Sequence, residues 1–466
     1  MVYFHINYSP ETIEFLREVL VKTKNPTDKE KIKRLFFSIN GIYLFKKTVG
    51  IEDKIATFKS RAKVKIDEKT VPFYELQPLI SRSNDYSVRD KYGKEYIRVV
   101  KKTINLEQKI IETISITIKK ELGFDGYIDY CQRMKKVNYY EFAEKIDEFT
   151  FITEKLYRRE TTNLVKSLMN KKISGIPFWH LFYLRKRPFL DQYFPKNQLL
   201  SSVNKTLSGL GINLTRYKNI HIDIKPRPKK YPRPYCYWSK VPQEIHLIIK
   251  PIGGIIDYEN FFHELGHALH YGLTNPKLDF EFRYLSRSNA LTETYAFLME
   301  NLCYNPIWLK EIMGLNKKEI NKIVYYSLLL DFIFMRRNTV KFLYELEMFK
   351  KSAIKDGGKI YAEKLSNLTG FIYYPENYLN DTDPEFYSVD YLRAWIANAQ
   401  LENYLIKKFG EDWFTKKQTG DFLKNLWSWG DLYSLEEVLK KVGCKKTDPK
   451  YLLNKYQSLS KLAKLI

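Results

Sequence analysis

The sequence predicts a mainly α-helical protein with one small β-sheet. Apolar and charged residues recur at helical spacing over residues 105–122 and 139–170, and again over most of the chain after residue 257. Short segments rich in β-branched residues with alternating character occur at 220–224 and 244–250. The chain has 466 residues, 44% of them apolar, which is enough for two or three domains with a large core.

The first part of the chain is expected to form an N-terminal helical domain, residues 1–200. Its first helix is expected to start at Ser9, a residue suited to cap a helix, followed by Pro10 at the first helical position. The helical pattern then continues to about Lys22. The remaining residues, 201–466, are expected to form a second domain that carries the chemistry described below.

The second domain is expected to open with the two short strands, which we predict to form a small sheet just before the most informative motif. Proline-rich residues 226–234 separate the two strands. After the sheet the pattern returns to helix and stays helical. The segments expected to be helical are 258–271, 289–303, 317–355, 359–368, 384–408 and 434–442.

The chain is strongly basic, with a formal net charge of +24. A concentrated positive charge would indicate a nucleic acid or an anionic surface as partner. Lysines are instead spread along the whole chain, and the basic run at 229–233 is interrupted by proline. We therefore interpret the charge as a solvated surface and expect no nucleic-acid partner.

Several other classes of protein are excluded by composition. No apolar run approaches the roughly 18 residues of a membrane-spanning helix, and the first residues lack the order of a secretory signal. The four cysteines lie far apart without a C-x-x-C pair, which excludes a disulfide scaffold or a cysteine-type zinc site. We expect a cytoplasmic protein that does not bind membranes, and the oligomeric state stays open.

The most informative motif is H-E-x-x-H, in which His263 and His267 lie four residues apart on a predicted helix. Two imidazoles one turn apart on one helical face suit two nitrogen ligands of a single Zn²⁺. Glu264 lies beside such a metal, where it can take a proton from an activated water. Residue frequencies give about 0.01 chance occurrences of this pattern here. The alternative is a helix with ordinary surface or core histidines.

A zinc site needs a third protein ligand, and the predicted helix at 289–303 offers two carboxylates. Glu293 follows His267 by 26 positions, and an acidic ligand one helix later is typical of gluzincins. Glu300, seven residues further on the same face, could be the ligand instead, could orient a histidine, or could be an ordinary helix carboxylate. Glu259, one turn before His263, could accept the outer N–H of that imidazole or face solvent.

The segment FFHELGHALHYG resembles the corresponding segment of the thimet oligopeptidase, neurolysin and oligoendopeptidase F family of zinc peptidases. The later segment ETYAFLME resembles that family's glutamate-ligand helix, and RPYCYWSKVPQEIHLII resembles the stretch before the zinc helix. The similarity covers residues 125–440 and is most specific at 235–300. It implies two helical lobes around a deep substrate channel that admits peptides and excludes folded proteins, with one zinc ion per chain.

The same resemblance implies a role for tyrosines near the end of the chain. Tyr387 and Tyr391 lie four residues apart in DPEFYSVDYLRAWIANAQL, and family members carry tyrosines at this spacing that donate hydrogen bonds to the tetrahedral intermediate. A chain with 36 tyrosines also contains many such pairs by chance, so a core stripe that includes Trp395 is the alternative. The family's long members carry a histidine shortly before the first tyrosine, where this chain has Asn380, Asp381 and Thr382.

Two further features bear on the substrate. Residues 244–250 are expected to form an edge strand that pairs with an extended peptide, or alternatively a purely structural strand. Arg393 could contact a substrate carboxylate, although we expect an exposed helix arginine.

These observations favour a zinc peptidase that cuts short, unfolded peptides, with Glu264 as general base. A zinc carboxypeptidase that trims peptides from the C-terminus is the first alternative. The second is a basic nucleic-acid-binding or scaffold protein whose zinc helix is inactive.

Overall fold

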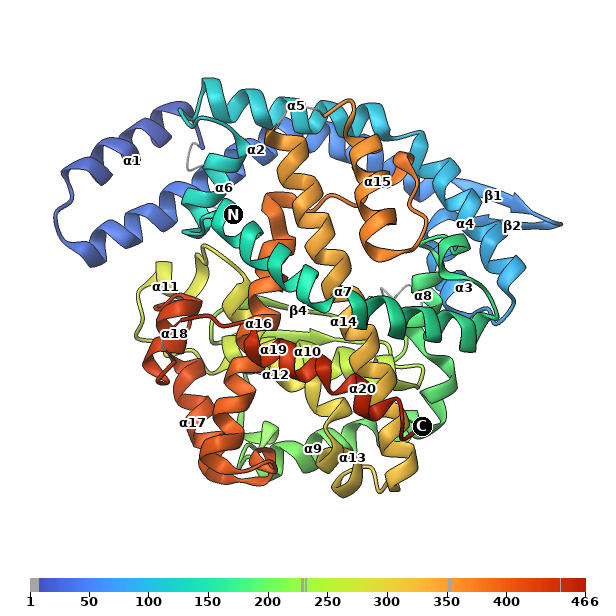
Figure 1. Ribbon diagram of the computed structural model, residues 1–466. Coiled ribbons are helices and arrows are strands. Elements are labelled where there is room, and N and C mark those ends of the chain that lie inside the picture. Colours follow the sequence, from blue (N-terminus) through green and yellow to red (C-terminus); the bar gives the residue numbers. More distant parts are fainter. Residues whose placement is uncertain (1–7, 228–229, 231–232, 351–353, 445) are drawn as a thin grey trace. The chain divides into compact units, whose positions relative to one another are not determined.

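The computed structural model describes residues 8–227, 230, 233–350, 354–444 and 446–466, and its ribbon is mainly helical (Figure 1). Within this described part, the β-structure that forms sheets is limited to one two-stranded and one three-stranded sheet. The predicted mainly α fold with a small sheet next to the H-E-x-x-H helix is therefore confirmed. The two lobes around a channel stay a prediction.

The chain folds into two compact units, each assembled from separate segments. The first comprises the described residues of Met1–Ile152, Thr161–Arg185 and Arg336–Ser388, and the second comprises Thr153–Glu160, Lys186–Met335 and the described residues of Val389–Ile466. Both units draw on residues from either side of position 200. The predicted division into domains 1–200 and 201–466 remains a prediction.

The first unit is built from helices and a β-hairpin. Its elements are α1 (Pro10–Lys22), α2 (Pro26–Arg61), β1 (Lys63–Ile66), β2 (Lys69–Pro72), α3 (Phe73–Arg82), α4 (Tyr86–Lys101), α5 (Ile104–Lys120), α6 (Tyr127–Lys135), most of α8 (His180–Lys186) and α15 (Gly357–Thr369). Ser9 caps α1, because its side chain accepts a hydrogen bond from the N–H of Thr12. The predicted start and end of this helix are thereby confirmed.

The second unit holds the three-stranded sheet and the helices around it. Its elements are α9 (Leu199–Gly209), β3 (Ile220–Asp223), β4 (Tyr235–Lys240), β5 (Glu244–Ile248), α10 (Ile255–Gly272), α11 (Phe280–Tyr284), α12 (Ala290–Glu300), α13 (Pro306–Glu311), α17 (Lys417–Ser428), α18 (Leu435–Lys441), α19 (Lys450–Gln457) and α20 (Leu459–Leu462). Three long helices each include residues of both units: α7 (Tyr139–Met169), α14 (Lys317–Lys350) and α16 (Tyr387–Phe409). Of the predicted helix 317–355, residues 351–353 lie outside the described residues.

Strand β5 lies in the middle of the three-stranded sheet. It pairs with β3 in parallel and with β4 in antiparallel orientation. The prediction that residues 244–250 form an edge strand is wrong, because both sides of β5 already hold a neighbouring strand. The sheet edge next to the H-E-x-x-H helix belongs instead to β4, which we did not predict as a strand.

The core of the second unit lies between the sheet, α10 and α12. Ile245 and Leu247 on β5 are fully buried, as are Phe261 and Leu265 on α10. They belong to one continuous cluster of apolar side chains that also includes residues of α12, α13, α16 and α17. Packing on this cluster fixes where the functional face of α10 points, because the helix buries its apolar stripe there.

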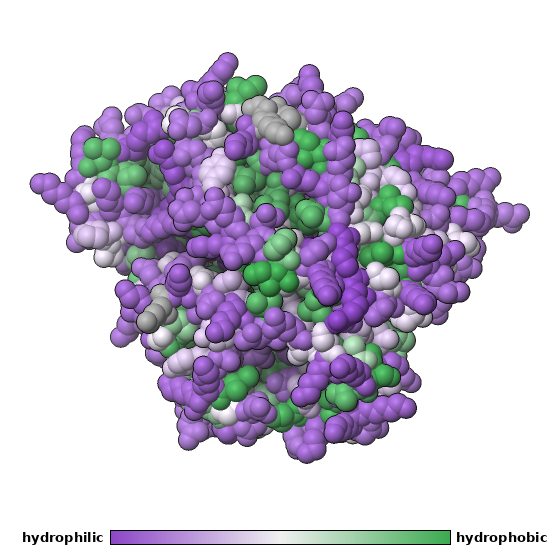
Figure 2. Space-filling view, viewed as in Figure 1, coloured by the Kyte–Doolittle hydropathy of each residue, from purple (hydrophilic) through white to green (hydrophobic). Residues whose placement is uncertain are grey.

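The surface has the polar character expected from the dispersed lysines. Hydrophilic side chains spread over most of the face drawn in Figure 2, and apolar residues appear there only in scattered groups. None of the helices in the described part of the chain combines the length and apolar character that a membrane span requires.

Candidate metal centre

Helices α10 and α12 approach each other unusually closely at Gly266, between the two histidines of the motif. A Cβ atom built on Gly266 would lie 2.6 Å from the Cα of Ala296 and 2.6 Å from the carbonyl oxygen of Tyr295. Both of these are main-chain atoms of α12, which cannot move aside without moving the helix. Only glycine therefore allows this contact, and the contact brings the ligand-bearing faces of the two helices together.

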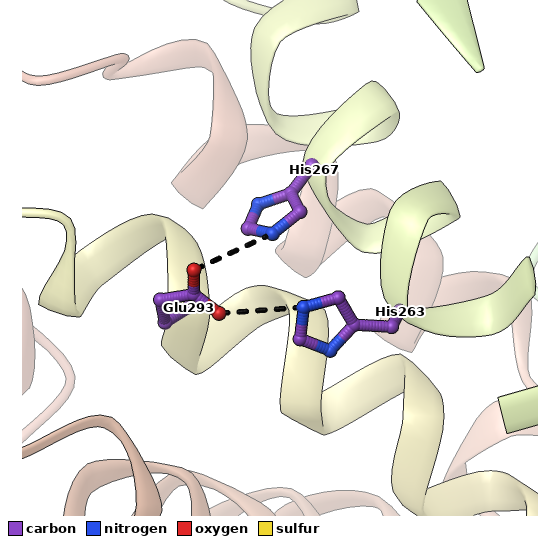
Figure 3. A group of neighbouring side chains, drawn as sticks. All are labelled: His263, His267 and Glu293. Carbon is purple, nitrogen blue, oxygen red and sulfur yellow. Dashed lines mark ion pairs between the residues drawn. The ribbon is translucent and has the colours of Figure 1, made fainter. Parts of the chain in front are cut away.

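Three predicted ligands converge at this contact (Figure 3). The Nε2 atom of His263 lies 3.3 Å from one carboxylate oxygen of Glu293, and the Nε2 atom of His267 lies 3.8 Å from the other. One ligand atom from each residue falls within 4.8 Å of the other two. The carboxylate of Glu293 is 4% exposed, so a cation is the natural partner for its charge at this depth.

The opposite nitrogens of the two imidazoles are held by α12 as well. Nδ1 of His263 lies 2.7 Å from Glu300 Oε2, and Nδ1 of His267 lies 2.7 Å from Thr292 Oγ1. If each Nδ1 carries the proton, it donates to these oxygens and leaves Nε2 with a lone pair for a metal. The two rings are therefore oriented with Nε2 toward Glu293.

Of the two positions considered for Glu259, beside His263 or facing solvent, the structure shows neither, because Glu300 meets the outer nitrogen of His263 and Glu259 is buried. Both nitrogens of His263 face α12, so the acceptor for Nδ1 comes from Glu300 rather than from the preceding turn of α10. Glu259 is buried and its carboxylate accepts a hydrogen bond from Arg187, whose guanidinium also donates to Ser327 Oγ at 2.9 Å. This ion pair anchors the first turns of α10 instead.

The electrostatics of the two histidines differ. Burial lowers the pKa of the His267 imidazole to about 4, so this ring is neutral near pH 7, which is the form that binds a metal. Burial also lowers the pKa of His263, but hydrogen bonds and charges from Glu293 and Glu300 outweigh it and raise the pKa well above its ordinary value. The two carboxylates thus favour a positive charge at this point, either a proton or a metal ion.

The residues at this point fit a zinc ion. Two imidazole nitrogens and one carboxylate oxygen are a ligand set that Zn²⁺ takes in catalytic sites, with a fourth position left for water or substrate. Ligand atoms around one tetrahedral Zn²⁺ lie about 3.4 Å apart. The two histidine nitrogens lie 3.3 and 3.8 Å from different oxygens of Glu293, and one ligand atom from each of the three residues lies within 4.8 Å of the other two, which is close enough for the three residues to share one ion.

Glu264 lies one residue after the first ligand and is half-buried. The main-chain N–H of Cys236 on β4 faces its carboxylate. Burial raises the pKa of Glu264, while the charge of His263 and the main-chain N–H of Cys236 counteract this. The edge of β4 and the side chain of Glu264 are therefore next to each other.

The two tyrosines of α16 lie in different surroundings. In the second unit, the ring of Tyr391 lies 6.0 Å from that of Phe297 on α12, and Phe297 lies 5.4 Å from the ring of His263. Tyr391 is thus one ring removed from a candidate ligand. Tyr387 belongs to the first unit, where Lys135 Nζ lies 6.0 Å from its ring centre. Both tyrosines are half-buried.

A buried polar network holds the start of α12. Ser288 Oγ donates to Asp390 Oδ1 at 2.7 Å and accepts from the N–H of Ala290, and Asp390 also accepts from the N–H of Asn289. Arg393 donates to Ser288 Oγ at 2.9 Å and to Glu436 Oε1 at 2.7 Å. We expected Arg393 to be exposed, and this is wrong, because this network buries it to 4% exposure.

Three contributors to the site were missed by sequence reasoning. Thr292 directly precedes the predicted ligand Glu293, and its hydroxyl could have been proposed as a partner for a histidine. Gly266 stands between the two histidines in a helix interior, where glycine is unfavourable unless a neighbour requires it. The N–H of Cys236 had no signal in the sequence, because β4 was not predicted as a strand.

Comparison with known proteins assigns the chain to a family of peptidases. A family model described as "Peptidase family M3" matches residues 94–458, most of the chain and all of the candidate metal centre. Among curated proteins, no sequence matches this chain.

We predict that Gly266→Ala weakens zinc binding and lowers stability. The new methyl group must push the α12 main chain away, which costs about 1–3 kcal/mol in a packed core and draws Glu293 away from the histidines. Competition with a chromogenic zinc chelator and thermal unfolding measure the two effects. Gly50→Ala is the matched control, because Gly50 also lies within a helix but a Cβ there meets no atom within 4 Å. Equal zinc affinity in both variants would contradict the assigned role of Gly266.

We also predict that Glu300→Ala lowers zinc affinity by about 10- to 100-fold, because His263 loses the acceptor that orients its ring. Zinc titration followed by competition with a chelator measures this change. Glu311→Ala serves as control, since the Glu311 side chain is 53% exposed on α13. An unchanged affinity for Glu300→Ala would show that the contact with His263 does not support the ligand.

Proposed function

The chain belongs to peptidase family M3, and from this premise we propose that it is a zinc-dependent oligoendopeptidase. In this proposal it cuts internal bonds of short, unfolded peptides. The observation that carries the proposal is the meeting of His263, His267 and Glu293 around one point, with Glu264 beside it. Membership of the family makes the protein a metallopeptidase with peptide substrates.

His263, His267 and Glu293 would hold the metal. A bound Zn²⁺ would polarise the carbonyl group of the scissile bond and lower the pKa of a water molecule. Glu300 and Thr292 would keep the two imidazoles in the tautomer that presents Nε2. The deep burial of Glu293 would keep competing water away from its carboxylate.

Glu264 is proposed as the general base and acid. Its half-buried carboxylate would take a proton from the attacking water and later deliver this proton to the leaving amine. The nearby main-chain N–H of Cys236 supports this role, because it places the carboxylate at the edge of β4.

Tyr391 or Tyr387 is proposed to donate a hydrogen bond to the oxyanion that forms during attack. A phenol is a neutral donor and stabilises developing negative charge without neutralising the metal ligands. The position of Tyr391, one ring removed from His263, supports it for this role. Tyr387 precedes it by one helical turn on α16.

The substrate is proposed to lie along β4 rather than along β5. Strand β4 is the edge of the sheet, so its outer main-chain groups can pair with an extended peptide. The contact between Cys236 and Glu264 supports this placement, because it puts the edge next to the proposed base. Main-chain pairing does not depend on side-chain identity, which suits a peptidase that accepts varied peptides.

We predict that Glu264→Gln retains zinc and loses nearly all turnover. An amide cannot take the proton from water, and loss of general acid–base catalysis lowers kcat by about 10²–10⁴-fold. Zinc content by elemental analysis and turnover of an internally quenched peptide measure the two properties. Substantial turnover in rigorously purified Glu264→Gln protein would rule out Glu264 as the base.

We further predict that a chelator abolishes cleavage of a mixture of short peptides and that added Zn²⁺ restores it. Mass spectrometry of the products then identifies the mode of action. Internal cuts at early times support an oligoendopeptidase, whereas loss of single C-terminal residues supports a carboxypeptidase. Absence of cleavage by the zinc-loaded protein, together with salt-dependent binding of RNA or DNA, would favour an inactive binding protein.

A further inference from the structure

Three aromatic rings form a continuous row across the three-stranded sheet. His221 on β3, His246 on β5 and Tyr237 on β4 occupy the same register position in the three strands. The ring centres of His221 and His246 lie 4.9 Å apart, and those of His246 and Tyr237 lie 4.7 Å apart. The ring planes deviate by only 24° and 9° from parallel. We call these three stacked residues the ring ladder.

The ring ladder repeats with the period of the sheet itself. Neighbouring strands lie about 4.7–4.9 Å apart, and this spacing matches the separation of the rings. His246 Nε2 also lies 3.1 Å from Glu244 Oε1, which fixes the orientation of the middle ring. Each additional strand at this sheet edge would therefore bring its side chain at this register into stacking distance of the ladder.

The ring ladder lies on the face of the sheet opposite the buried core. Ile245 and Leu247, the neighbours of His246 in β5, are fully buried in the cluster that contains α10. Side chains alternate between the faces of a strand, so His246 and its partners point away from α10. Tyr237 exposes 42% of its surface, although it is a large aromatic residue.

Tyr237 is also the last ring before the open edge of the sheet. Strand β4 has β5 on one side, and on its other side the N–H of Cys236 turns outward to Glu264. Alternate residues of an antiparallel strand turn their main-chain groups to opposite sides, so those of Tyr237 point to β5. A residue added opposite Tyr237 would then form a non-hydrogen-bonded pair, in which side chains approach most closely.

We propose that the substrate peptide continues the ring ladder, so that an aromatic side chain of the peptide stacks on Tyr237. This inference rests on the proposed pairing of the peptide with β4, and it names a preference that main-chain pairing alone does not provide. A nucleic-acid base could also stack on Tyr237, but it could not use the main-chain edge of β4. The preferred ligand is therefore an extended peptide with Phe, Tyr or Trp at one position.

The position of this preference is restricted by the geometry of a strand. Only one residue of the peptide lies opposite Tyr237, and its two neighbours point to the other face of the sheet. The dependence on Tyr237 should therefore appear at a single substrate position and disappear one residue to either side. A general affinity for apolar peptides would not show this alternation.

The test uses zinc-loaded protein and internally quenched peptides that are alanine-rich except for one residue, scanned through each position around the cut. At the ladder position, Phe should raise kcat/KM by about two- to tenfold over Ala, the range of an aromatic pair, whereas Leu should give less. Tyr237→Ala should bring the Phe-to-Ala ratio at this position toward one, and Tyr237→Phe should keep it. Tyr140→Ala is the matched control, because Tyr140 is 43% exposed on α7.

A second readout separates this inference from the proposed function. Binding of the same peptides to the zinc-loaded Glu264→Gln protein, followed by fluorescence anisotropy, should show the same Phe preference and its loss in Glu264→Gln/Tyr237→Ala. If Tyr237→Ala protein cleaves peptides with an unchanged preference for Phe, the proposed stacking on Tyr237 is wrong, but the proposed peptidase function stands. If the peptides bind in a way that depends on Tyr237 but are not cleaved, the proposed peptidase function is wrong, but the proposed stacking on Tyr237 stands. Tyr237-dependent binding of single-stranded RNA, without the peptide preference, would also overturn the inference.

Discussion

The close contact between α10 and α12 is the constraint on which the candidate metal centre depends. One helix supplies both histidines, and the other supplies Glu293 together with the partners of both imidazoles. These groups meet because Gly266 has no side chain, so the main chain of α12 packs directly against it. The geometry of the site is therefore a property of helix packing, and no flexible loop has to order itself to form it.

Charge explains why this packing produces a cation site rather than an ordinary core. Glu293 brings a carboxylate to a depth at which an isolated negative charge is costly, and Glu300 adds a second carboxylate at the outer nitrogen of His263. The imidazole of His263 responds by holding a proton more strongly, as its raised pKa indicates. A divalent ion can replace this proton and satisfy both the carboxylate and the two rings.

Much of this arrangement could be predicted from the sequence, because periodicity and spacing are local properties. The ends of α1 and the extent of α7 follow from caps and from helical patterns, and the histidine spacing indicated the metal, whereas α10 begins at Ile255, before the predicted residue 258. The predictions that failed are those that depend on which segments become neighbours in space. The place of β5 in the sheet depends on β4, whose residues 235–240 carry few β-branched side chains and follow a proline-rich stretch. Glu259 was considered as a partner of His263 because it lies one turn away in the same helix. Glu300 on α12 is the residue that meets this histidine.

The burial of Arg393 was missed for the same reason, because it depends on residues that are neighbours only in space. An arginine on a helix is ordinarily solvated, and its partners Ser288 and Glu436 are distant in the sequence. The aromatic register of the ring ladder was equally hidden, since His221, Tyr237 and His246 come from three strands whose order could not be read from the chain.

The network at the start of α12 has a consequence for how the site responds to change. Asp390 and Arg393 on α16 grip Ser288 and Asn289, which immediately precede the helix of Glu293, while the next residue after Asp390 is Tyr391. The proposed oxyanion donor Tyr391 and the third ligand Glu293 are thus both attached to the same hydrogen-bonded network. A substitution that breaks this network would therefore displace the phenol of Tyr391 and the carboxylate of Glu293 together.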